Sequence, residues 1–196
     1  MAGESGKGTR KPRAEVARNR ERLLAAAVDV FRGGGRGASL EAVARRAEVG
    51  IGTLYRHFPT REALFEAVYR REVEDLARLA ESLGAGPDPV DALRCWVRAG
   101  IGLVATKQGM LTALALAVDK SSDVHTYSLD HLTRAVGLLL ANAVAADLIR
   151  DDVEPQDVLQ ALVGLSMTGK EPGWEANVVR LLDIFIDGLV KHENEA

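Results

Sequence analysis

Residues 49–64 read Val-Gly-Ile-Gly-Thr-Leu-Tyr-Arg-His-Phe-Pro-Thr-Arg-Glu-Ala-Leu, and they carry the strongest structural signal in the chain. The pair Val49-Gly50 predicts a tight turn, because glycine tolerates backbone angles that other residues avoid. A short helix is expected from Ile51 to His57, closed by Phe58-Pro59, with Leu54 and Phe58 packed inward. Thr60 is placed to cap a further, longer helix.

Two helices are expected before this turn. Ser39 sits where an N-cap belongs, with Glu41 in the first turn, so a short helix should follow. Its buried side is formed by Leu40, Val43, Ala44 and Ala47. Further upstream, apolar residues recur at helical spacing from Ala14 to Phe31, and Gly33-Gly34-Gly35 ends that helix. Three helices with a tight turn between the last two make a helix-turn-helix, whose final helix enters the major groove of DNA.

Residues 49–64 resemble the signature of the TetR family of bacterial transcriptional regulators, and the stretch Ser39–Ala47 resembles the second helix of that family. The match spans about 50 residues, and the order Gly, Thr-Leu-Tyr, His-Phe and a basic residue is specific. The resemblance implies a homodimer with an N-terminal DNA-binding domain. It also implies a C-terminal domain that binds a small effector and then releases the DNA.

The resemblance assigns contacts on double-stranded DNA to Ser39, Ile51, Gly52, Thr53, Tyr55, Arg56, His57 and Arg61. It implies that Tyr55 touches a phosphate or a base edge, and that Arg61 replaces a usual lysine. Ile51 and Gly52 match the positions nearest the base edges, yet they offer only an apolar side chain and a bare backbone. Specificity is therefore expected to depend on Tyr55, Arg56, backbone contacts and DNA shape.

Charge is divided unevenly along the 196 residues. Residues 1–71 contain 15 Lys or Arg against 8 Asp or Glu, whereas residues 72–196 contain 10 against 20. This asymmetry favours a basic part that faces nucleic acid, although chance clustering on solvated helices would give the same numbers. The lone Cys95 excludes an internal disulfide, and the apolar stretches are too short to span a membrane. We expect a cytoplasmic protein.

The whole chain is expected to be all-α, with about nine helices. Residues 1–12 are predicted to be a disordered basic arm, residues 13–65 the helix-turn-helix domain, and residues 66–196 a helical effector-binding and dimerisation domain. The second part should contain one helix from Pro89 to about Thr106 and a separate, shorter one near residues 109–118. Further helices should begin after Ser121-Ser122-Asp123, at Pro155 and at Trp174.

Two groups of residues are predicted sites in the second domain. An effector pocket, which composition suggests takes a small apolar ligand, is assigned to Trp96, Met110, Tyr127 and Met167, although packing roles would explain them too. An acidic effector would require Arg94, Arg98 or Arg134 to turn inward. The dimer interface is assigned to Leu162, Val178, Leu182, Phe185 and Leu189, and the alternative is that these residues close the core of one protomer.

Other kinds of site find little support. Residues 164–170 fit the first seven places of a phosphate-binding loop, but Glu171 stands where Ser or Thr must ligate magnesium. The four histidines are too scattered to bind a metal, and no nucleophile has a partner in the sequence. We expect no cofactor and no enzymatic activity. The alternative function is a ligand-binding or interaction protein whose DNA binding has degraded, and a helical enzyme is the remaining rival.

Overall fold

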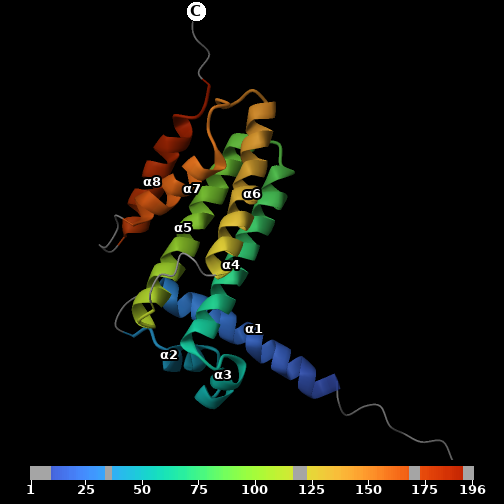
Figure 1. Cartoon of the computed structure of the whole chain (residues 1–196), viewed down its shortest axis with the longest axis vertical. Coiled ribbons are helices and arrows are strands. Elements are labelled where there is room, and N and C mark those ends of the chain that lie inside the picture. Colours follow the sequence, from blue (N-terminus) through green and yellow to red (C-terminus); the bar gives the residue numbers. More distant parts are fainter. Residues whose placement is uncertain (1–9, 34–36, 117–122, 168–172, 192–196) are drawn as a thin grey trace, which may run out of the picture. The chain divides into compact units, whose positions relative to one another are not determined.

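The computed structural model of this protein describes residues 10–33, 37–116, 123–167 and 173–191. Across these ranges the chain forms eight α-helices and no β-strand, which confirms the all-α prediction (Figure 1). The helices are α1 (Arg10–Arg32), α2 (Leu40–Arg46), α3 (Ile51–His57), α4 (Arg61–Gly84), α5 (Pro89–Ala113), α6 (Asp123–Ala145), α7 (Pro155–Ser166) and α8 (Trp174–Asp187).

The chain divides into two compact units. Unit 1 comprises residues 1–68 together with 108–117, and unit 2 comprises residues 69–107 and 118–196. The helices α4 and α5 therefore each contribute to both units. The sequence placed a boundary after residue 65 and assigned the whole of 66–196 to one domain, so the return of residues 108–117 to unit 1 was not anticipated.

The core of unit 1 joins the end of α5 to the first four helices. Met110 of α5 and Leu114, the residue directly after α5, are buried in the same apolar cluster as Phe31 of α1 and Leu54 of α3. Other members of this cluster are Leu23, Leu24, Val43, Phe58, Leu64 and Val68. Because Met110 and Leu114 belong to this core, the end of α5 is a structural part of unit 1.

The helix count differs from the prediction at Gly109. We predicted a break between Thr106 and Gly109, but α5 runs without interruption from Pro89 to Ala113. A Cβ atom at position 109 would overlap the carbonyl group of Phe31. Glycine is therefore needed there for the close approach of two backbones, and it does not mark a helix end.

The predicted caps are present where the structure describes them. The Ser39 hydroxyl accepts a hydrogen bond from the Ala42 amide at 3.2 Å, and Thr60 accepts one from Ala63 at 3.1 Å. Asp88, directly before α5, is a further N-cap, which accepts from the Asp91 amide at 2.9 Å. At the other end of the chain α1 begins at Arg10, earlier than the predicted start at Ala14, and residues 1–9 lie outside the described residues. Ser121 and Ser122, which precede the helix predicted to follow them, also lie outside the described residues.

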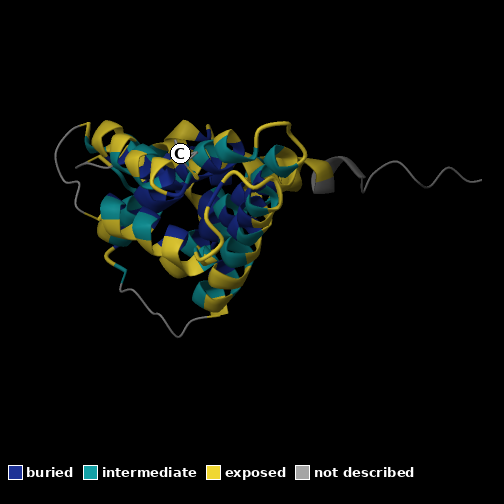
Figure 2. Cartoon of the chain, turned by 90° about the horizontal axis from the view of Figure 1, so that it is seen from above, coloured by how far each residue is buried: buried dark blue, intermediate teal, exposed yellow. Residues whose placement is uncertain are grey.

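Unit 2 packs α6 against α7 and α7 against α8. Gly100 of α5 faces Leu162 of α7, where a Cβ would come within 2.6 Å of the leucine side chain. Trp96 is fully buried, and its indole nitrogen donates to the carbonyl of Leu76 at 2.9 Å. Figure 2 shows how buried and exposed residues alternate around the helices, as amphipathic packing requires.

Candidate nucleic-acid interface

The turn between α2 and α3 is held by backbone hydrogen bonds. The Glu48 amide donates to Arg45 at 3.1 Å, and the Val49 amide donates to Ala44 at 3.0 Å. Glu48 has a φ of 53°, in the left-handed region. These two bonds and the left-handed residue form a Schellman motif, which ends α2 sharply and turns the chain into α3.

The helix α3 buries one side chain and exposes one face. Leu54 is fully buried in the core of unit 1, whereas Ile51 is 39% exposed and Tyr55 is 45% exposed. Arg56 is also exposed, and a Cβ added at Gly52 would meet nothing within 4 Å. These four residues lie at positions 1, 2, 5 and 6 of the helix, so they share one face at helical spacing. That face is the one predicted to meet DNA.

Thr53 and His57 are half-buried at the edges of that face. The centroid of the His57 ring lies 6.3 Å from that of Phe58. The Arg20 guanidinium lies over the ring of Phe58, 5.4 Å from its centroid. Cation–π contact of this kind adds modestly to the packing of Phe58. Both Thr53 and His57 therefore border the core while keeping part of their side chains accessible.

The other two predicted contact residues have structural partners. Ser39 uses its hydroxyl to cap α2, as described above. Arg61 is exposed at the start of α4, and its Nη1 donates to the carbonyl of Leu114 at 3.4 Å, which ties α4 to the end of α5 within unit 1. A guanidinium has five N–H groups, so this one contact leaves donors for a phosphate.

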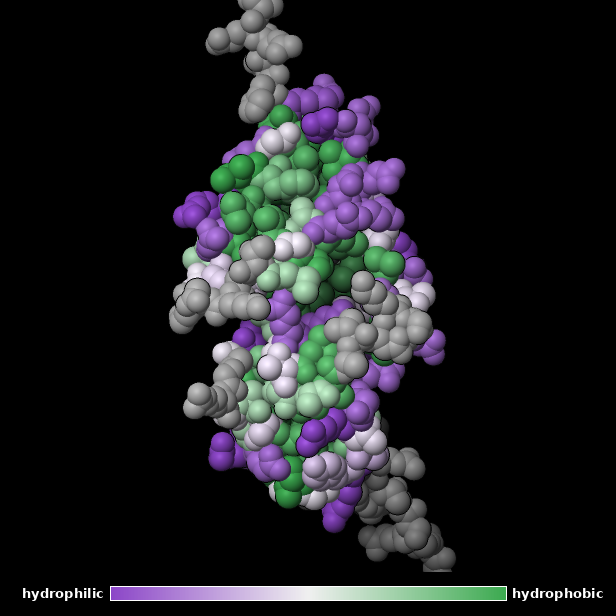
Figure 3. Space-filling view, turned by 60° about the vertical axis from the view of Figure 1, so that its left-hand side comes forward, coloured by the Kyte–Doolittle hydropathy of each residue, from purple (hydrophilic) through white to green (hydrophobic). Residues whose placement is uncertain are grey.

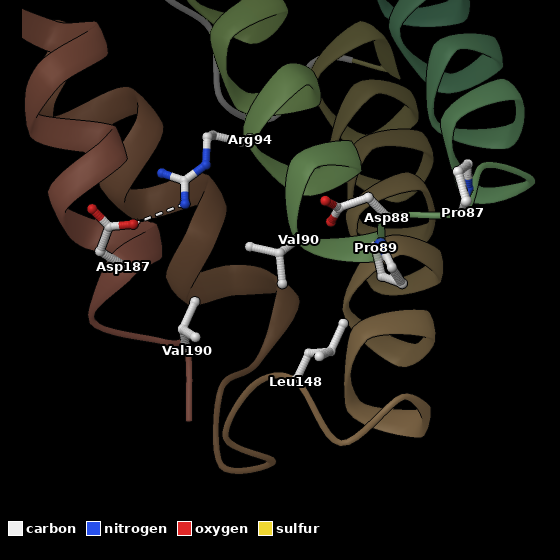
Figure 4. Close-up of a pocket in the computed structure, with 8 residues that line it drawn as sticks. All are labelled: Pro87, Asp88, Pro89, Val90, Arg94, Leu148, Asp187 and Val190. Atoms are coloured by element: carbon white, nitrogen blue, oxygen red, sulfur yellow. Dashed lines mark hydrogen bonds and ion pairs between the residues drawn. The ribbon is translucent and has the colours of Figure 1, made fainter. Parts of the chain in front are cut away.

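Unit 2 has a hollow of its own. A cavity of about 760 Å³, which we call the α5–α8 groove, lies beside the start of α5, the turn after α6 and the end of α8 (Figure 4). It is lined by Pro87, Asp88, Pro89, Val90, Arg94, Leu148, Asp187 and Val190. Arg94 points toward Asp187 and donates to it at 2.8 Å. The remaining lining is mostly apolar.

Sequence comparison matches both parts of the chain to described families. Residues 23–68 match the family described as bacterial regulatory proteins, tetR family, and residues 88–191 match the SbtR-like transcriptional regulator C-terminal domain. The second match alone spans more than half of the chain. The chain belongs to the TetR family of transcriptional regulators.

Solved TetR structures resemble this one over nearly their whole length. A TetR transcriptional regulator of Streptomyces coelicolor is 44% identical, with 87% of this chain and 98% of that chain covered and a TM-score of 0.75. A TetR transcription regulatory protein of Mycobacterium vanbaalenii is 34% identical, covering 91% and 99%, with a TM-score of 0.69.

A curated TetR relative matches over a shorter stretch. The HTH-type transcriptional repressor KstR of Mycolicibacterium smegmatis is 36% identical over 80 residues, which are 40% of this chain and 39% of that protein. The match to KstR thus spans about two fifths of the relative's length.

The four residues predicted to line an effector pocket are not brought together. Met110 belongs to the core of unit 1, and Trp96 is a core residue whose only polar atom is satisfied by Leu76. Met167 is 65% exposed at the end of α7. Tyr127 stacks on His131 with ring centroids 3.9 Å apart, and its hydroxyl donates to Glu74 at 3.0 Å. None of the four lines the α5–α8 groove.

The arginines that an acidic effector would require are engaged with carboxylates or turned outward. Arg98 donates from Nη2 to both carboxylate oxygens of Asp183 at 2.9 and 2.8 Å, and Arg94 contacts Asp183 as well as Asp187. Arg134 is exposed and donates to a carbonyl of its own helix. These contacts fasten α5 to α8 within unit 2, so Arg94 and Arg98 have a structural role.

The predicted dimer-interface residues lie mostly in the interior of the chain. Leu162, Val178, Leu182 and Leu189 are buried inside the protomer, and only Phe185 is half-buried. The stripe chosen from the sequence is thus the face that closes the core of unit 2. Large apolar side chains are exposed at Val163 of α7, at Met167 directly after α7 and at Ile184 of α8.

The described ranges contain neither a metal-binding cluster nor a membrane-spanning helix. No group of three or more His, Cys, Asp or Glu side chains in them is arranged to hold a metal ion. Every helix in the same ranges is too short or too polar to cross a membrane.

Proposed function

We propose that this TetR-family chain is a repressor that binds a pseudo-palindromic operator in double-stranded DNA as a homodimer. The exposed face of α3, with Ile51, Gly52, Tyr55 and Arg56 around the buried Leu54, is the observation that supports the proposal most directly. Two such helices reach successive major grooves when their centres lie about 34–36 Å apart along the DNA.

Recognition of the operator sequence by α3 is expected to combine few hydrogen bonds to base edges with a close approach of the α3 backbone to the DNA. Ile51 can contact a thymine methyl group, and the open space at Gly52 lets the α3 backbone come near the bases. Tyr55 and Arg56 supply the hydrogen-bonding groups of this face. Sequence-dependent DNA shape then contributes at positions that no side chain touches.

The test is selection of bound fragments from the source genome, followed by gel-shift titration at two salt concentrations. Tyr55→Ala should abolish tight binding to the selected fragment, whereas Tyr55→Phe, which retains the ring, should lose only the hydroxyl contact. The wild type should show a steep salt dependence, in which each phosphate contact lowers log K by about 0.9 for every tenfold rise in salt concentration. If no fragment is enriched and all three proteins bind alike, the rival function, a ligand-binding or interaction protein with degraded DNA binding, replaces this one.

The homodimer is proposed to use the outer faces of α7 and α8. Val163, Met167 and Ile184 are 44%, 65% and 61% exposed. Figure 3 shows hydrophobic side chains gathered on the side of unit 2 where α7 and α8 lie. A sizeable exposed apolar patch on a water-soluble domain is typical of a protein interface, which supports this face as the contact between two copies.

An effector is proposed to bind unit 2 and to lower the affinity for DNA. A small apolar molecule suits the lining of the α5–α8 groove, where Val90, Leu148 and Val190 supply apolar surface. The effector switches the protein only to the extent that it binds the DNA-incompetent state more tightly than the DNA-bound one.

Thermal-shift screening of lipophilic metabolites tests the effector site. A compound that raises the melting temperature of the wild type should have no effect on Leu148→Glu, because Leu148 lines the groove and is 39% exposed, so a charge is tolerated there. Leu129→Glu is the matched control, since Leu129 is 47% exposed on α6 and does not line the groove. A shift that survives Leu148→Glu would place the effector elsewhere.

A further inference from the structure

The left-handed position that follows the C-terminal end of α2 is occupied by glutamate in place of the usual glycine. In a Schellman motif the left-handed residue is usually glycine, because a Cβ atom is disfavoured there. This chain has Glu48 at that position, with a φ of 53°. The turn that directs α3 is therefore made by a residue whose own preference opposes it.

Arg22 of α1 contacts this turn from outside. Its Nη2 donates to the carbonyl of Ala47 and, at 3.1 Å, to the carbonyl of Glu48. The same nitrogen lies 3.5 Å from the Glu48 carboxylate. The two Schellman bonds satisfy the carbonyls of Ala44 and Arg45, and Arg22 satisfies two carbonyls further along the turn, those of Ala47 and Glu48. A positive charge at the C-terminal end of a helix is also favourable.

We propose that Arg22 is a positioning residue for DNA recognition, which fixes the direction of α3 by holding the α2–α3 turn. The inference rests on the proposed DNA binding and adds a residue that makes no contact with DNA itself. The Arg22 Nη2 group contacts three oxygen atoms of the turn. The helix α3 that follows has only seven residues and one fully buried side chain, so few contacts of its own fix its direction. The direction of α3 therefore depends strongly on the turn that precedes it.

A second consequence concerns Glu48. Its carboxylate faces the Arg22 guanidinium, and the two side chains form an ion pair. Arg22 stabilises the left-handed backbone, and Glu48 neutralises part of the charge held over the turn. Replacing Glu48 by glycine should make the turn stable without Arg22, because glycine adopts positive φ readily.

The experiment compares Arg22→Ala with Arg18→Ala, an exposed arginine one helical turn earlier in α1, which controls for the loss of one charge. Affinities are measured for the selected operator and for random duplex DNA over a range of salt concentrations. Arg22→Ala should weaken operator binding by about tenfold or more beyond the control, and random-duplex binding should match that of the control. The slope of log K against log salt should equal that of the wild type.

The opposite pattern would overturn the proposal. If Arg22 neutralises a phosphate, both DNAs lose affinity alike and the slope becomes shallower by about 0.9. Unchanged operator binding would overturn it as well. If Arg22→Ala does not fold, Arg22→Lys is measured instead, since it retains the charge but lacks the guanidinium fork and should show a smaller, operator-specific loss.

A rescue and a DNA-free readout complete the test. Arg22→Ala/Glu48→Gly should regain operator affinity, whereas Arg22→Ala/Glu48→Gln, which removes the same charge but retains the Cβ, should not. In the free full-length protein, amide hydrogen exchange at Glu48 and Val49 should be faster in Arg22→Ala and slow again in the glycine double variant. This readout holds even if the wild type binds no operator, so failure of the proposed function is distinguished from failure of the Arg22 role. Unchanged exchange would contradict the role of Arg22.

Discussion

Gly109 of α5 lies directly against the carbonyl group of Phe31 at the end of α1, and no side chain fits between the two backbones. This contact holds the last turn of α5 in the core of unit 1, where Met110 and Leu114 are buried. The close approach has a measurable energetic consequence.

Gly109→Ala should lower the free energy of unfolding by about 2 kcal/mol, because the added methyl group overlaps backbone atoms that cannot rotate away. Gly137→Ala is the control, since a Cβ there would meet Pro155 at an ordinary 3.5 Å. The control should be neutral or gain up to about 1 kcal/mol from helix propensity. Urea unfolding followed by far-ultraviolet circular dichroism measures both, and an equal response of the two variants would contradict the contact.

The buried and exposed side chains of α8 allow folding to be separated from the proposed dimerisation. Leu182→Ala should cost about 3 kcal/mol, because Leu182 is fully buried and its loss leaves a cavity. Ile184→Glu should leave the protomer folded, since Ile184 is 61% exposed, but should abolish the proposed dimer. Sedimentation velocity gives the oligomeric state, and a dimeric Ile184→Glu protein would place the interface on another face.

Ser39 allows capping to be separated from phosphate contact. Ser39→Ala should destabilise unit 1 by about 1 kcal/mol, because the Ala42 amide loses its acceptor. Ser39→Asp should retain the cap and the stability, but its negative charge should weaken DNA binding if the position faces a phosphate. Full DNA affinity in Ser39→Asp would show that the hydroxyl serves the helix alone.

Cys95 should react slowly with alkylating reagents near neutral pH. Burial raises the pKa of its thiol, the neighbouring Asp91 carboxylate raises the pKa further, and Arg98 lowers it by a smaller amount. A raised pKa means less thiolate, which is the reactive form. Asp91→Asn should lower the pKa and speed alkylation by iodoacetamide, with the largest gain below the ordinary thiol pKa. A variant that reacts at the wild-type rate at every pH would contradict this account.

The helix-turn-helix was predictable because its signals are local. Ser39 caps the helix that it directly precedes, Leu54 faces inward one turn after the break, and Thr60 caps α4 within three residues. Patterns of this kind depend on hydrogen bonds and side-chain spacing inside a single element. The exposed residues of α3 follow from the same spacing.

Other features depend on contacts between residues far apart in the chain. Arg22 meets the turn across 26 residues, and Gly109 meets Phe31 across a longer separation, so neither contact leaves a pattern in the sequence. On α8, apolar residues occupy both faces, with Leu182 inside and Ile184 outside. The spacing of apolar residues in the sequence identifies both apolar faces of α8, but it does not indicate which face packs in the core of the protomer.

The sharing of α5 between the two units has a consequence for engineering. A chimaeric regulator that takes its DNA specificity from this protein needs residues 108–117 as well as the first 68, because Met110 and Leu114 complete the core around α3. Grafting the N-terminal segment alone would leave that core open to water. Two stretches of the gene must therefore be exchanged together, and the second stretch lies within the coding region of the recipient's ligand-binding part.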